Sequence, residues 1–224
     1  MLKFNYIIPL GGGCQLTYQL RRAFNFGTAF PLDWWVTNMR GVIDALDPGK
    51  DPYDDLTPFL NPGGENKIAH IRTGNHNIEL HHEFPRGEDK CVLPDWREHT
   101  GRARERFRYL RNRLLQLNEK SSNILFVRHK GNKIIGETTT TNAASVDDMI
   151  DYVNSVFTRS HNTFLLINAP DSCKPSDVLA LSLDDAQHDN WRGDHERWRR
   201  ALTEITLENP ALKPFTDKTV WEIW

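Results

Sequence analysis

The chain has few cysteines, no long apolar run and almost no net charge, and each of these shortages excludes a class of protein. Its three cysteines, Cys14, Cys91 and Cys173, are odd in number and widely spaced, which argues against a disulfide framework and against a CxxC zinc site. No apolar stretch reaches the roughly 18 residues of a membrane span. The net charge of −2 gives no electrostatic case for nucleic acid or for an anionic membrane as partner.

Length and the first residues define the expected organisation. A chain of 224 residues suits one domain with a full core, so we expect a single domain over 1–224 with a helical extension over about 185–224. Met1 to Asn5 lead directly into a predicted strand and show no signal-peptide cleavage pattern. Together with the sparse cysteines, this predicts a cytoplasmic, reducing environment.

Apolar runs alternate with amphipathic segments, which predicts an α/β fold. The strand–helix–strand order over 123–168 has continuously apolar strands, which is typical of a parallel βαβ unit covered on both faces. We therefore expect a mostly parallel sheet flanked by helices. The predicted strands are 4–10, 67–72, 77–84, 123–129, 162–168 and 178–183, and the predicted helices are 14–24, 36–46, 95 or 101 to 118, 145–157 and 190–206, with at most a short helix over 54–60.

The glycine run before Cys14 is the most informative local feature. Gly11, Gly12 and Gly13 follow an apolar strand, and Cys14 stands at the start of a predicted helix. A helix N-terminus carries partial positive charge and unpaired N–H groups, so it favours a thiolate, and glycines allow close approach and positive φ. These residues indicate either a nucleophilic cysteine or a buried structural cysteine after a tight turn, and the local pattern leaves both open.

A catalytic thiol needs an imidazole partner, and the candidates are His81 and His82. Alternation along a strand points these two side chains to opposite faces, so at most one of them faces Cys14. Asp33, in the turn before two tryptophans, is a candidate to orient the imidazole, although it is also well placed to cap a helix.

Arginine is abundant in two places. Seven arginines lie between 97 and 113, where they form either a solvated helix face or a site for phosphate, carboxylate or an acidic partner. Arg128 ends an apolar strand, where a buried guanidinium would need a carboxylate or an anionic ligand. No metal site is expected, because the histidines lack the i,i+4 spacing of a zincin, and the glycine run is neither a Walker A loop nor a dinucleotide fingerprint.

Taken together, the motifs resemble a bacterial domain-of-unknown-function family described as papain-like cysteine peptidases. The similarity spans roughly residues 5–170, in the family's order. It is carried by Leu10-Gly11 to Cys14, Leu20-Arg21-Arg22, Pro31-Leu32-Asp33-Trp34, His82-Glu83-Phe84, Arg102 with Glu105-Arg106-Phe107, and Leu125-Phe126-Val127-Arg128. Leu32 and Glu83 stand where the family pattern has Phe and Asp.

The resemblance implies that Cys14 is the nucleophile and that His82, rather than His81, is its base. We prefer Asp33 to Glu83 as the orienting acid. N–H groups at Gly13 and Cys14, with Gln15, would hold an oxyanion. The further expected substrate contacts are Arg21, Arg22, Trp34 and Arg128.

The sequence thus predicts an acyl-transfer enzyme, either a hydrolase or an acyltransferase, acting on a small-molecule, glycan or peptide acyl substrate. It requires no cofactor and no metal, with coenzyme A as a candidate acyl donor because of the arginine-rich helix. The alternative is a non-catalytic module that binds an anionic sugar or phosphate through Arg21, Arg22 and Arg128, with Cys14 structural.

Overall fold

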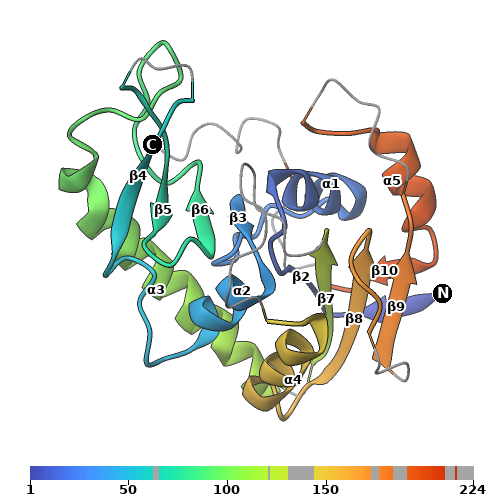
Figure 1. Cartoon of the computed structure of the whole chain (residues 1–224). Helices are drawn as coiled ribbons and strands as arrows, with labels where there is room; N and C mark the ends of the chain where they lie inside the picture. Colours follow the sequence, from blue (N-terminus) through green and yellow to red (C-terminus); the bar gives the residue numbers. More distant parts are fainter. Residues whose placement is uncertain are drawn as a thin grey trace.

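A four-stranded parallel sheet forms one part of the molecule, seen on the right of the computed structural model in Figure 1. The structure describes residues 1–62, 66–120, 122–130, 144–172, 177–183, 191–209 and 215. The strand order is β2-β7-β8-β9, and every neighbouring pair is parallel. The sequence prediction of an α/β fold with a parallel sheet is confirmed. The strands are β2 (Tyr6–Pro9), β7 (Asn123–His129), β8 (His161–Ile167) and β9 (Val178–Leu181).

The predicted βαβ unit is present. Helix α4 (Val146–Val156) connects β7 to β8, and its start is fixed by a capping box between Ser145 and Asp148. Its buried face carries Val146, Met149, Ile150 and Val153, at the spacing of one helical stripe. Strand β7 is buried from its second residue onward, which accounts for its continuously apolar sequence.

A second, antiparallel sheet of four strands stands beside the parallel one (Figure 1), with the order β3-β6-β5-β4. Two of its strands were not predicted. The segment 54–60, expected to be loop with at most a short helix, instead contains β4, which pairs with β5. The first residues of the expected helix 36–46 form β3. Both errors arise from partners distant in sequence. The strands are β3 (Trp35–Thr37), β4 (Leu56–Leu60), β5 (Ile68–Thr73) and β6 (Ile78–Leu80), and α2 is Met39–Leu46.

The arginine-rich helix α3 (Thr100–Leu115) lies between two 3-10 turns, η1 (Trp96–His99) and η2 (Gln116–Lys120). Its buried stripe includes Phe107, whose ring stacks on Trp35 at 5.1 Å between centroids. On its polar side, Arg104 and Arg108 form ion pairs with Asp51. Several of the arginines therefore stabilise the loop before β4 through ion pairs.

Of the helical extension expected over about 185–224, the structure describes 191–209 and 215, and this part is less helical than expected. Helix α5 (His195–Ala201) is followed by strand β10 (Ile205–Leu207), which pairs in parallel with the N-terminal strand β1 (Leu2–Phe4). The predicted helix over 190–206 is therefore wrong in its last residues, and its first residue lies outside the described part. Within the described ranges, no helix has both the length and the apolar character needed to cross a bilayer.

Candidate active site

Cys14 is the first residue of α1 (Cys14–Phe24), which follows β2 directly at the carboxyl edge of the parallel sheet. Ligand sites of open parallel sheets form at this edge. The three glycines before it have φ values of 73°, 100° and 147°. A Cβ on Gly12 would lie 1.7 Å from the carbonyl oxygen of His129, whereas one on Gly13 would meet nothing within 4 Å. Gly12 therefore allows the chain to pack, while Gly13 leaves space next to the cysteine.

The start of α1 is arranged around the thiol. The N-cap residue of α1 is Gly13, which has no side chain to cap the helix, and the first turn contains no acidic residue. The Cys14 thiol donates a hydrogen bond to the carbonyl oxygen of Trp34, at 3.3 Å. Trp34 has a φ of 65°, which is strained for a bulky residue. The chain thus adopts an unfavourable backbone conformation at the residue whose carbonyl fixes the thiol.

The resting thiol is protonated. Burial raises the pKa of Cys14 to about 12, and the charge of Glu79 adds to this rise, while the cysteine's own backbone N–H and Arg86 act in the opposite direction. The expected preference for a thiolate at a helix start is therefore outweighed by removal of the sulfur from water.

His82 lies two residues beyond the end of β6, in the loop that follows it. Its ring packs edge-on against Trp34, with 6.0 Å between the centroids, so Cys14 and His82 both contact this residue. Burial, assisted by the charges of His81 and Arg86, lowers the pKa of His82 to about 4. His81 has a different partner, since its Nε2 lies 2.9 Å from Glu79.

Arg86 fixes the loop that carries His82. Its guanidinium donates hydrogen bonds to the carbonyl oxygens of His81, Ala69 and Lys90, so one side chain joins three backbone segments. Burial lowers the pKa of Arg86, and interaction with the Cys91 and Cys14 sulfurs opposes this shift. A fixed cation is thus placed in the electrostatic neighbourhood of Cys14.

Asp33 is buried and is held by other partners than the predicted imidazole. It accepts a hydrogen bond from Arg21 within a buried ion pair, and a second from the Phe30 N–H at 2.7 Å. Burial raises the pKa of Asp33, and Arg21 opposes this. Glu83, the other acid considered, instead accepts from Trp35 Nε1 at 3.1 Å. The described hydrogen bonds of Asp33 stabilise the turn that ends at Trp34. The carbonyl oxygen of Trp34 in turn accepts the hydrogen bond from the Cys14 thiol.

Two of the predicted substrate arginines lie in the interior. Arg21 is 3% exposed and is occupied by Asp33. Arg128 is fully buried and donates to the Leu10 carbonyl, the Thr37 hydroxyl and the Thr37 carbonyl, and burial lowers its pKa to about 9. Arg128 therefore joins the parallel sheet to β3 of the antiparallel sheet.

The remaining predicted contacts lie around α1. Arg22 donates to the Tyr18 hydroxyl at 3.0 Å. Trp34 is 2% exposed, so it acts as a wall packed against Cys14. The side-chain amide of Gln15 lies against Gly193, because a Cβ there would be 2.2 Å from its Nε2.

An aromatic group that was not predicted adjoins the cysteine. Trp191 packs edge-on against both Tyr18 and Trp34, with centroid distances of 5.6 and 6.5 Å, and it is 41% exposed. The Arg192 guanidinium lies over both Tyr18 and Trp191. An exposed indole beside a cysteine at a helix start would give a ligand a flat surface to stack on. Only the tertiary structure shows this, since Trp191 is distant from Tyr18 in the sequence.

A polar group in the hairpin was also missed. His70, Glu79 and His81 bring one ligand atom each to within 4.8 Å of one another. Burial would raise the pKa of Glu79, but the two imidazoles outweigh it and hold that pKa below its ordinary value. The hairpin register could have indicated this group, because it places His70 across from His81.

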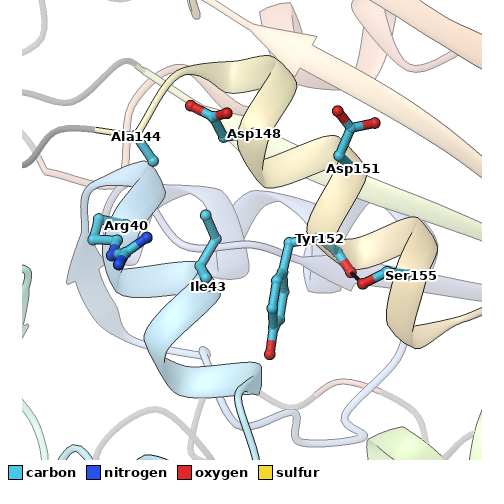
Figure 2. Close-up of a pocket in the computed structure, with 7 residues that line it drawn as sticks. All are labelled: Arg40, Ile43, Ala144, Asp148, Asp151, Tyr152 and Ser155. Carbon is cyan, nitrogen blue, oxygen red and sulfur yellow. Dashed lines mark hydrogen bonds between the residues drawn. The ribbon is translucent and has the colours of Figure 1, made fainter.

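A separate cavity of about 750 Å³ lies between α2 and α4 (Figure 2). Arg40 and Ile43 line it from α2, and Asp148, Asp151 and Tyr152 line it from α4. None of its lining residues is a cysteine or a histidine, and none belongs to the Cys14 site. The site residues predicted from the sequence therefore lie apart from this cavity, around the carboxyl edge of the parallel sheet.

Comparison of the chain with protein-family models, with curated proteins and with solved structures found no match. Inference about function therefore rests on the residues and their geometry.

Proposed function

We propose that this protein is a cysteine-nucleophile enzyme of the acyl-transfer class, in which Cys14 attacks and His82 acts as its base. The observation that carries the proposal is the arrangement at Trp34. Its strained backbone presents a carbonyl to the Cys14 thiol, and its ring packs against His82. Strained backbone of this kind occurs preferentially at functional sites. The uncapped helix start and the open space at Gly13 supply room and N–H groups for an oxyanion.

The proposed reaction has two halves. Cys14 Sγ forms a bond to the carbonyl carbon of the substrate as its proton passes to the His82 imidazole, and the carbonyl π electrons move onto oxygen. Collapse of this tetrahedral intermediate expels the leaving group, which takes the proton from His82 and leaves a thioester on Cys14. The acceptor then attacks the thioester, loses its proton to His82, and the departing sulfur recovers that proton.

The neutral resting pair accords with this order of events. With the thiol protonated and the imidazole uncharged, proton transfer accompanies attack instead of preceding it. The Arg21–Asp33 ion pair contributes indirectly, since it fixes the turn whose last residue orients the thiol.

The acceptor decides between the two named activities. Water makes the protein a hydrolase, as in the papain-like peptidases that its motifs resemble, and a hydroxyl or amine makes it an acyltransferase. Coenzyme A as donor is less supported than the reaction itself, because Arg104, Arg108 and Arg111 of α3 are occupied by the loop over 47–54.

Trapping the acyl-enzyme tests the proposal. The full chain is incubated with acyl thioesters, including acyl-coenzyme A, and with activated esters and peptide amides, then quenched in acid and analysed by peptide mass spectrometry. We expect the acyl mass on Cys14 in the wild type and in Cys91→Ser, and its absence from Cys14→Ser. His82→Gln should slow acylation by about 10²- to 10⁴-fold, the usual contribution of a general base. Acyl transfer that survives Cys14→Ser, or an inert protein across the whole panel, would contradict the assignment.

The anion-binding alternative has less support. Of its three proposed ligands, Arg21 is paired with Asp33, Arg128 is buried in the core, and Arg22 is bonded to Tyr18. Titration with inorganic phosphate and with a sugar phosphate, comparing the wild type with Arg22→Ala, would favour this alternative if saturable binding depended on Arg22.

A further inference from the structure

The antiparallel sheet brings two histidines and a glutamate onto one of its faces. Strands β5 and β6 pair Ile71 with Leu80 and Arg72 with Glu79, so the next position places His70 opposite His81. Glu79 and His81 are two residues apart along the chain and therefore point to the same side. Three ligand-type side chains from two adjacent strands thus converge by register alone.

Two distances between donor atoms of these side chains are close to those between ligands of one zinc ion, and all three donor atoms lie within 4.8 Å of one another. His81 Nε2 lies 2.9 Å from one oxygen of Glu79, and His70 Nε2 lies 3.5 Å from the other. Ligands bound tetrahedrally at about 2.0–2.1 Å from zinc are about 3.3 Å apart, and the two observed distances bracket this value. The imidazoles stack on each other with 4.4 Å between centroids, and Phe59 stacks on the far side of His70. The rings are therefore held in place before any ion binds.

One nitrogen in this group lacks a hydrogen bond. His70 is 4% exposed, and its Nε2 has no hydrogen-bond partner among the described residues, since 3.5 Å to Glu79 is too long for a good bond. A buried polar atom without a partner costs free energy and calls for an explanation. Arg72, the register partner of Glu79, has its guanidinium over the Phe59 ring at 5.0 Å. A metal ion bound between the imidazoles and the carboxylate would satisfy the His70 nitrogen.

We infer that His70, Glu79 and His81 form a binding site for a divalent transition-metal ion of the zinc class. Two imidazole nitrogens and one carboxylate are a donor set used for Zn²⁺ and Fe²⁺, and three protein ligands leave a position for water or substrate. His81 is the ligand nearest to solvent, with a quarter of its side chain exposed, which gives the ion a path of entry. The inference goes beyond the proposed thiol chemistry, because none of its three ligands is used there.

The test uses the full chain, stripped with a chelator and titrated with Co²⁺ and Zn²⁺. We expect one equivalent to bind, with the visible absorption of four- or five-coordinate Co²⁺. His81→Gln and His70→Gln should each weaken affinity by more than the roughly 10- to 100-fold that loss of an outer partner costs. His161→Gln, which changes an exposed histidine at the start of β8, is the matched control and should bind as the wild type does. Circular dichroism and thermal melting establish that each variant is folded.

X-ray absorption of the wild-type Zn²⁺ complex needs no variant. It should show imidazole scattering and only nitrogen or oxygen ligands near 2.0–2.1 Å. Sulfur near 2.3 Å, or binding abolished by Cys14→Ser but kept by His81→Gln, would place the ion on the thiol and overturn the inference. Equal metal binding by the wild type, His70→Gln and His81→Gln, or no metal binding at all, would overturn the inference and leave the three side chains with a structural role in joining β5 to β6. Because Cys14→Ser should abolish acylation but preserve Co²⁺ binding, failure of one proposal is distinguishable from failure of the other.

Discussion

Alkylation of Cys14 in the free protein should be slow at neutral pH and should accelerate far into the alkaline range. With a pKa of about 12, the thiolate fraction at pH 7 is about 10⁻⁵, against roughly 3% for an ordinary cysteine of pKa about 8.5. The population of reactive sulfur is thus lower by about 3,000-fold. A thiolate of higher pKa is intrinsically more nucleophilic. With a Brønsted coefficient of about 0.4–0.5, the rate constant of the Cys14 thiolate should exceed that of the ordinary thiolate by roughly 30- to 60-fold. The net expectation is alkylation about 50- to 100-fold slower than that of a model thiol.

The assay is iodoacetamide labelling of the full chain at pH 6 to 11, with modification of Cys14 quantified at the peptide level. The reference is a blocked cysteine peptide in the same tube. Burial alone also slows labelling, but the shape of the profile separates the two causes. A pKa of about 12 gives a rate that rises tenfold per pH unit through pH 10, whereas steric protection of an ordinary thiol gives a plateau above about pH 9.

In denaturant, the rate at Cys14 should match the reference. A plateau in the native protein, or native labelling at pH 7 faster than the peptide, would refute the electrostatic reasoning and favour a preformed thiolate.

Two further predictions concern stability, measured by urea unfolding. Asp33→Ala should lower the free energy of unfolding by about 3–5 kcal/mol, because it leaves Arg21 buried without its partner. Asp54→Ala, which removes an exposed ion pair, should lower it by less than about 1 kcal/mol. Similar losses in the two variants would contradict the buried pairing. Gly12→Ala should destabilise the protein more than Gly13→Ala. Both substitutions cost about 1–3 kcal/mol of backbone strain at a positive φ, but only the Gly12 variant also places a Cβ against a carbonyl oxygen of β7. The reverse order would show that the glycine loop packs differently.

The sequence correctly predicts those helices and strands whose apolar spacing and capping residues lie within the segment itself. Helix α1 begins at Cys14 and ends at Phe24, as predicted, because its apolar spacing is helical and three glycines precede it. The βαβ unit was equally readable, since continuously apolar strands and the Ser145 capping signal are both local. These features need no knowledge of distant partners.

The elements that failed depend on partners elsewhere in the chain. Residues Leu56–Leu60 form a strand because β5 is available to pair with them, and no property of the segment alone indicates this. In the same way, the helix expected from 36 begins only at Met39, where Asn38 caps it, because the preceding residues pair with β6.

For the site, the sequence identified the chemical types but not their pairings. The sequence predicts that Asp33 orients an imidazole, whereas in the fold Asp33, in the turn before β3, pairs with Arg21 of α1. The buried position of Arg128 was anticipated, but its carbonyl and hydroxyl partners on Leu10 and Thr37 could not be, since they depend on how the two sheets meet. His70 carried no motif at all and gains its significance from strand register.

The pairing of β1 with β10 has a consequence for how the molecule forms. Among the described residues, Leu2 to Phe4 pair with Ile205 to Leu207, which lie far later in the sequence. Closing so long a loop raises the entropic cost only slowly with length, but it delays the contact. Until that contact forms, β1 is an unpaired strand directly before β2 in the sequence. A variant that ends before 205 would lack this partner strand, so the backbone N–H and C=O groups of β1 would lose their sheet hydrogen bonds.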